Sequence, residues 1–156
     1  TSSGAASLVL PAMGMTLTNS EFIEPMANLL KTNPPWAEQF WGTVVLLPQA
    51  IGNASELRKR LYGMQGVNAH YRDADLIGEL VFHHQFEKAE SLYRLLTGIN
   101  REVSVVDNSS FENESAYPPI DWQLFSTGSF GATIKDGNLL LSAMPNAAAL
   151  VASHLM

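Results

Sequence analysis

Residues 105–133, VVDNSSFENESAYPPIDWQLFSTGSFGAT, differ in kind from the sequence before them. They open with an apolar pair, pass through a Tyr-Pro-Pro bend, and continue in short alternating runs interrupted by glycine. Short alternating runs between turn residues are typical of antiparallel β-structure. By contrast, residues 20–98 carry apolar side chains at the three- and four-residue spacing of helices. The sequence therefore predicts an α+β chain, in which antiparallel helical hairpins precede a partial antiparallel β-sandwich.

Composition restricts the class of protein. The 156 residues are 46% hydrophobic and 15% charged, which favours a folded core over disorder. The formal net charge is −6, whereas binding to nucleic acid requires clustered basic residues, so we expect no nucleic-acid partner. The absence of cysteine excludes disulfides and thiol sites. No apolar run approaches the ~18 residues of a transmembrane helix, so we expect no membrane span in this chain.

The helical part is expected to contain five helices, separated by Pro, Gly and Asn breakers. Their expected ranges are 21–31, 36–47, 54–64, 73–83 and 86–96. The small, polar segment 1–20 is expected to form a flexible arm or a docked strand. We therefore divide the chain into an arm (1–20), a helical repeat-like domain (21–98) and a β-sandwich segment (99–156).

Four apolar positions in the last two helices show a family pattern. Phe86 follows a short turn, Ala89 comes three residues later, Tyr93 four after that, and Leu76 lies in the preceding helix. With these residues, segment 73–98 resembles one tetratricopeptide repeat. The resemblance implies that Phe86, Ala89 and Tyr93 pack the two helices together. It also implies a helical surface that binds a protein partner.

The β-part is expected to contain strands at 122–125, 129–134 and 139–142, after an earlier one that starts near Val103. The Asp136-Gly137 pair between the last two predicts a tight hairpin turn. Residues 147–155 fit either a further strand or a short helix.

Asn108, Phe111 and Glu112, followed by Trp122, form a second family pattern. With these residues, segment 104–156 resembles the start of a jelly-roll carbohydrate-binding module. Such modules need about eight strands, and the segment accounts for four or five. We therefore expect an incomplete jelly roll, with an open edge that another strand completes.

The carbohydrate-binding resemblance suggests two sites. Tyr117 and Trp122 would stack on a sugar, and Asn113 and Gln123 would bind its hydroxyls, although Trp122 also suits the core of a sandwich. The oxygen-donor side chains in the matching motif would hold a structural calcium ion, which is the only cofactor expected. These donors are Asp107, Asn108 and Glu112. The alternative for this motif is an Asx-turn at Asn108 with a solvated Glu112.

Other chemistry has weaker patterns. His83 and Glu87 would share a face of a continuous helix, yet no third metal ligand is evident. Acid–base catalysis would need a carboxylate pair, for which the candidates are Glu112, Glu114 and Asp121. No serine lies in a nucleophile elbow, so no catalytic residue is assigned.

These observations predict a non-enzymatic interaction or scaffold protein of the bacterial cell envelope, linked to polysaccharide assembly or glycan binding. The chain starts with Thr1 rather than Met, which suggests a processed, periplasmic or otherwise extracytoplasmic protein. Two alternatives stay open. One is a fragment of a glycan-active hydrolase, and the other is a structural subunit that a partner β-strand completes.

Overall fold

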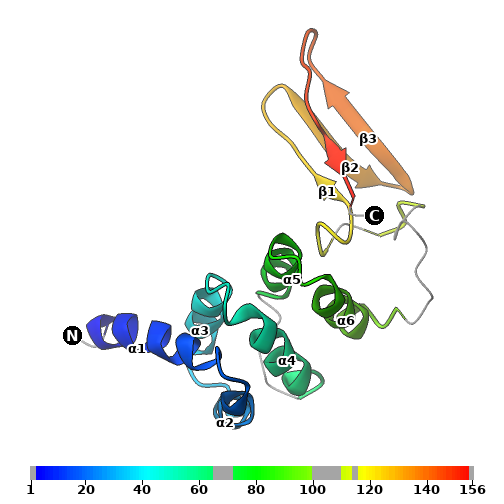
Figure 1. The fold of residues 1–156 in the computed structure, drawn as a ribbon. Helices are drawn as coiled ribbons and strands as arrows, with labels where there is room; N and C mark the ends of the chain where they lie inside the picture. Colours follow the sequence, from blue (N-terminus) through cyan, green and yellow to red (C-terminus); the bar gives the residue numbers. More distant parts are fainter. Residues whose placement is uncertain (1–2, 65–71, 100–109, 114–115, 155–156) are drawn as a thin grey trace. The chain divides into compact units, whose positions relative to one another are not determined.

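A computed structural model describes residues 3–64, 72–99, 110–113 and 116–154. The chain separates into two compact units, Thr1–Ile99 and Asn100–Met156. The first unit is helical and the second contains the strands, which confirms the predicted α+β class (Figure 1). No helix among the described residues combines the length and apolarity that crossing a bilayer requires.

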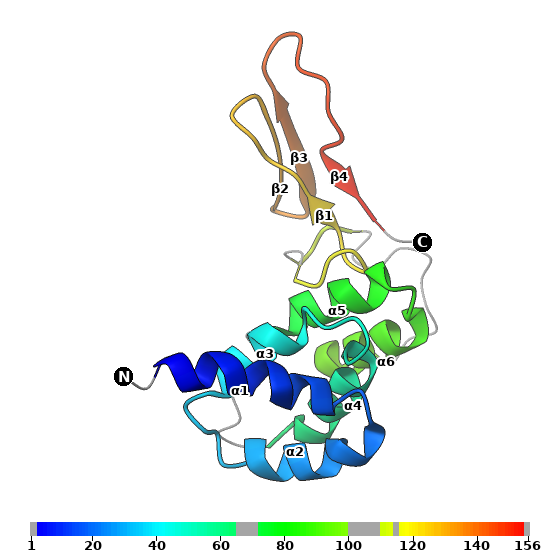
Figure 2. The same ribbon diagram turned by 60° about the vertical axis from the view of Figure 1, so that its left-hand side comes forward.

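The described part of the first unit contains six α-helices and one 3-10 turn (Figure 1). They are α1 (Ser3–Thr16), η1 (Ser20–Phe22), α2 (Ile23–Leu30), α3 (Ala37–Val44), α4 (Ile51–Leu61), α5 (Asp73–Phe82) and α6 (Phe86–Thr97). α1 packs on α3, and α4 contacts α2, α5 and α6 (Figure 2).

Helix α1 corrects the expectation of a flexible arm or a docked strand at 1–20. The expectation rests on the small, polar residues of the segment, yet Ser3–Thr16 form a helix that includes Pro11. Tertiary contacts hold its C-terminal end, because Leu17 is fully buried just after the helix and Asn53 donates a hydrogen bond to its carbonyl at 2.7 Å. Packing thus outweighs the weak local preference for helix.

Helix α4 begins earlier than expected. Gly52 and Asn53 are expected to precede a helix that starts at residue 54, yet both lie in the first turn of α4. A Cβ atom at Gly52 would meet the side chains of Gln85 and Lys88, so glycine here allows the close approach of α6.

The α5–α6 hairpin forms as the sequence predicts, and it has one exception to the repeat-like pattern. Leu76, Ala89 and Tyr93 are buried, and Gly98 ends α6 with φ +70°. Phe86, which was expected to pack between the helices, keeps 48% of its surface exposed. Its ring lies 5.7 Å from the ring of His84 in the turn before α6.

A buried ion pair joins α4 to the start of α5. Arg58 donates two hydrogen bonds to the Asp73 carboxylate, at 2.7 and 2.9 Å. The two side chains are 8% and 5% exposed. Because burial removes both charged groups from water, each is stabilised mainly by its partner.

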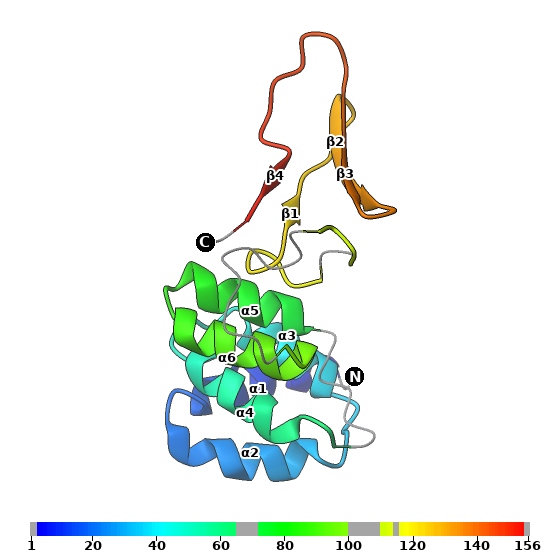
Figure 3. The same ribbon diagram turned by 90° about the vertical axis from the view of Figure 1, so that its right-hand side faces the viewer.

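The described part of the second unit has two two-stranded antiparallel sheets (Figures 2 and 3). β1 (Gln123–Leu124) pairs with β4 (Ala152–Ser153), and β2 (Phe130–Lys135) pairs with β3 (Asn138–Ala143). The strand β4 settles the open question at 147–155, since the segment contains a short strand. The expected strand near Val103 lies outside the described residues.

The β2–β3 hairpin turns at Asp136 and Gly137, as predicted. Their φ angles are +52° and +73°, the two positive values of a type I′ turn. Because the loop has only these two residues, it fixes the register of the whole hairpin.

Candidate functional site

The β2–β3 hairpin has one wholly apolar face. Cross-strand partners lie on the same face of a sheet, and alternate residues along each strand share it. The pairs Phe130–Ala143, Ala132–Leu141 and Ile134–Leu139 therefore form one face, which we call the apolar face. The opposite face carries polar residues and one glycine, and Leu140 is its one large apolar residue.

This apolar face is more exposed at Leu141 and Ala143 of β3 than on β2, while Leu139 near the turn is half-buried. Ala132 is 9% exposed, and Phe130 on the same strand is half-buried. Leu141, directly across from Ala132, is 59% exposed, and Ala143 is exposed as well. The side of the hairpin that carries β3 thus leaves apolar surface in water.

The turn also determines which backbone groups point outward. The residues that flank a two-residue hairpin loop, Lys135 and Asn138, exchange both peptide hydrogen bonds, and the pattern repeats every second pair. A bond of 2.8 Å from the Met144 N–H to the Ser129 carbonyl follows the same alternation. The remaining β3 residues direct their N–H and C=O groups away from β2, and we call these groups the β3 edge. They belong to Leu139, Leu141 and Ala143.

The outer edges of β2 and β3 differ in their hydrogen bonding. On β2, the Ser126 hydroxyl lies 3.3 Å from the Ala132 N–H nitrogen and 3.5 Å from its carbonyl oxygen. The Thr127 N–H donates to the Phe130 carbonyl at 2.7 Å. Within the described part of the chain, no group bonds to the β3 edge. The β3 edge is therefore the open one, and it is our candidate functional site.

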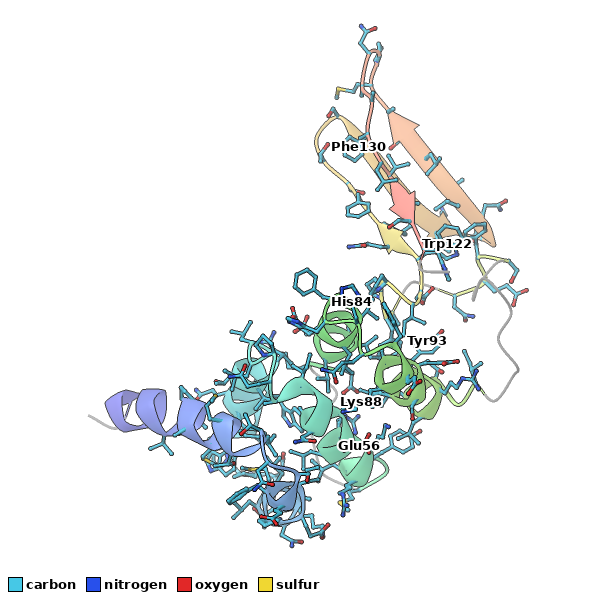
Figure 4. The ribbon with its side chains drawn as sticks, in the orientation of Figure 1. Glu56, His84, Lys88, Tyr93, Trp122 and Phe130 are labelled. Carbon is cyan, nitrogen blue, oxygen red and sulfur yellow. The ribbon has the colours of Figure 1, made fainter. Side chains whose placement is uncertain are left out.

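The predicted sugar platform has a different arrangement. The Trp122 ring, which is labelled in Figure 4, belongs to a small aromatic cluster. Its centre lies 5.2 Å from the ring centres of both Phe111 and His154. Tyr117 is half-buried, whereas the predicted hydroxyl-binding residues Asn113 and Gln123 are exposed. Trp122 itself is half-buried within this cluster, and sugar binding by these residues stays a prediction.

The structure describes two of the five oxygen donors proposed for catalysis or for calcium, Asp121 and Glu112, so both sites stay predictions. Asp121 is 5% exposed and accepts backbone hydrogen bonds from Ala116 and Trp122, at 3.1 and 2.8 Å. Its oxygens thus stabilise the turn that precedes β1. Glu112 is exposed. The other three candidates, Asp107, Asn108 and Glu114, lie outside the described residues.

The histidine–carboxylate pair is also different from the expectation. α5 ends at Phe82 and α6 begins at Phe86, so His83 and Glu87 do not share a helix. His83 lies 3.6 Å from Glu79 on α5 instead. Across the described ranges, His, Asp and Glu side chains form no group of three that could hold a metal ion.

Sequence reasoning anticipated an open β-edge but did not locate it. The alternation at 130–134 and 139–143 predicts which side chains share a face of the hairpin. Together with the Asp-Gly turn, it also predicts which peptide groups point outward. The role of Ser126 in covering β2 has no local sequence signal, because it depends on how the chain bends before the strand. Comparison of the chain with protein-family models, with curated proteins and with solved structures found no match.

Proposed function

We propose that this chain is a non-enzymatic interaction protein, and that its β2–β3 hairpin accepts a partner strand at the β3 edge. The observation that carries this proposal is the open edge itself, where outward peptide groups adjoin exposed Leu141. An added strand would bond to these groups and cover part of the apolar face, as in β-strand addition.

Two further observations support the choice of edge. Soluble proteins usually protect an edge strand with charge, proline or a bulge, and residues 139–143 contain none of these protections. A two-stranded hairpin is also marginally stable alone, so a third strand would stabilise it.

Glycan binding and hydrolysis are less well supported. The Trp122 ring is engaged by Phe111 and His154, and the Asp121 carboxylate is engaged by backbone N–H groups. The envelope location proposed from the sequence is compatible with strand addition but is not needed for it.

The test uses prolines placed at outward positions, where they remove no hydrogen bond between β2 and β3. Leu141→Pro blocks the β3 edge, and Ile134→Pro is the matched control at an outward position of β2. The probe is a fluorescein-labelled heptapeptide of alternating threonine and valine. Its anisotropy is measured at protein concentrations where light scattering shows monomers.

We expect saturable binding to the unmodified chain, binding at least tenfold weaker to Leu141→Pro, and unchanged binding to Ile134→Pro. Equal binding to the two proline variants, or no binding to the unmodified chain, would contradict the proposed function. Protection of the Leu140 and Ser142 amides from hydrogen exchange confirms that the hairpin survives each substitution.

A further inference from the structure

We infer that the partner strand is β3 of a second copy of this chain, in an antiparallel pair centred on Leu141. This inference rests on the proposed function and names its partner. The result would be a four-stranded sheet in the order β2–β3–β3–β2.

The hydrogen-bonding pattern of the β3 edge is complementary to itself. If Leu141 lies opposite Leu141 of the second copy, then Leu139 lies opposite Ala143, and each such pair exchanges two bonds. All the outward groups of both strands are then satisfied, by about six hydrogen bonds. A register shifted by one residue would place outward groups opposite inward ones, and would also exchange the two faces.

The side chains fit the same register. Residues that face each other in an antiparallel pair lie on one side of the sheet, so the two Leu141 side chains would be neighbours on the apolar face. This contact shields Leu141, which is 59% exposed in the single chain. On the opposite face, Leu140 of each copy would lie beside Ser142 of the other.

Charge does not oppose this pairing. Although the whole chain carries a net charge of −6, residues 137–156 contain no Asp, Glu, Lys or Arg. Two copies of β3 therefore bring no like charges together, and no complementary charge specifies a different partner. An uncharged, apolar strand fits this edge, and β3 is itself such a strand.

The cysteine-free sequence allows a direct test of register. The variants Leu140→Cys and Ser142→Cys, distinguished by a mass tag, are mixed and mildly oxidised. The inferred register makes 140 and 142 a directly facing, non-hydrogen-bonded pair, whose side chains are close enough for a disulfide. We expect the mixed disulfide to exceed the two same-variant disulfides combined at least fivefold, whereas random encounter of equal amounts of the variants makes it equal to their sum. Thr133→Cys, placed on β2, replaces Leu140→Cys in the control mixture and should give no such excess.

The unmodified chain should also show a concentration-dependent mass that approaches twice 17.0 kDa, and Leu141→Pro should remain monomeric. A monomer at all concentrations, a statistical disulfide mixture, or a dimer that persists in Leu141→Pro would overturn the inference. If the threonine–valine peptide binds at β3 while the chain stays monomeric, only the inference fails. If the peptide does not bind at β3, the proposed function fails, and the inference that rests on it fails as well.

Discussion

The two units of this chain bury very different amounts of apolar surface. The helical unit has a core of fully buried side chains, among them Phe40, Leu57, Leu80 and Leu92. Among the described residues of the β-unit, Ala132 is the sole buried apolar residue. A fold is stabilised mainly by the apolar area that it removes from water. The helical unit therefore has the core of a self-sufficient fold, whereas the β-unit has apolar surface available for a partner.

The largest expected effect lies in the helical unit. Arg58→Met leaves the Asp73 carboxylate buried without its partner, and we expect a loss of about 3–5 kcal/mol in the free energy of unfolding. The double variant Arg58→Met/Asp73→Leu should recover most of this loss. Urea denaturation of both variants measures the difference. A single variant as stable as the unmodified chain would show that the ion pair does not hold α4 to α5.

Replacing one leucine in each unit by alanine compares how much each unit depends on buried side chains. Leu80→Ala removes a fully buried side chain, so we expect a cost of about 2–5 kcal/mol. Leu140→Ala removes a side chain that is 47% exposed, and its cost should stay within about 0.5 kcal/mol in the monomer. Denaturation experiments on each variant test the contrast. Similar costs at the two positions would mean that the β-unit buries more than we describe.

The hairpin turn provides a third, smaller effect. Gly137 has φ +73°, a conformation that costs an L-residue about 1–2 kcal/mol. Gly137→Ala should therefore speed hydrogen exchange at the Leu140 and Ser142 amides. Gly128→Ala is the matched control, since a Cβ there meets open space and no positive φ opposes it. Equal exchange rates in the two variants would argue against the type I′ turn.

The smallest expected effect is an increase in the free energy of unfolding. Both ring nitrogens of His154 are buried beside the Trp122 ring, and no described residue forms a hydrogen bond with them. His154→Phe keeps the aromatic contact and removes the unsatisfied polar atoms, so we expect stabilisation by about 1 kcal/mol. His154→Asn keeps polar atoms and loses the ring, and it should destabilise. Thermal unfolding followed by Trp122 fluorescence, with Trp36 and Trp41 replaced by Phe, reports both changes.

How well sequence predicted structure also differs between the two units. The α5–α6 hairpin and the β2–β3 hairpin were predictable, because helical spacing, the Gly98 cap and the Asp136-Gly137 turn are local signals. Helix α1 was not, because contacts far along the chain hold its end. The exposure of Phe86 was missed for a similar reason, since a family pattern specifies a residue type but not the exact turn that orients it.

The site divides in the same way. An open β-edge was expected from a strand count that fell short of a jelly roll. Its location on β3 required the observation that Ser126 covers Ala132 on β2, and that Leu141 stays exposed. Both depend on tertiary placement, which alternation alone does not determine.

The central claim is that the β3 edge is open in the single chain and paired in the complex. Residue-resolved amide hydrogen exchange across a dilution series tests it most directly. We predict that the Leu140 and Ser142 amides are protected throughout, while those of Leu139, Leu141 and Ala143 exchange rapidly in dilute solution and slow as the concentration rises. Outward amides that remain protected in the monomer would show that the chain itself already covers this edge, and would contradict the account.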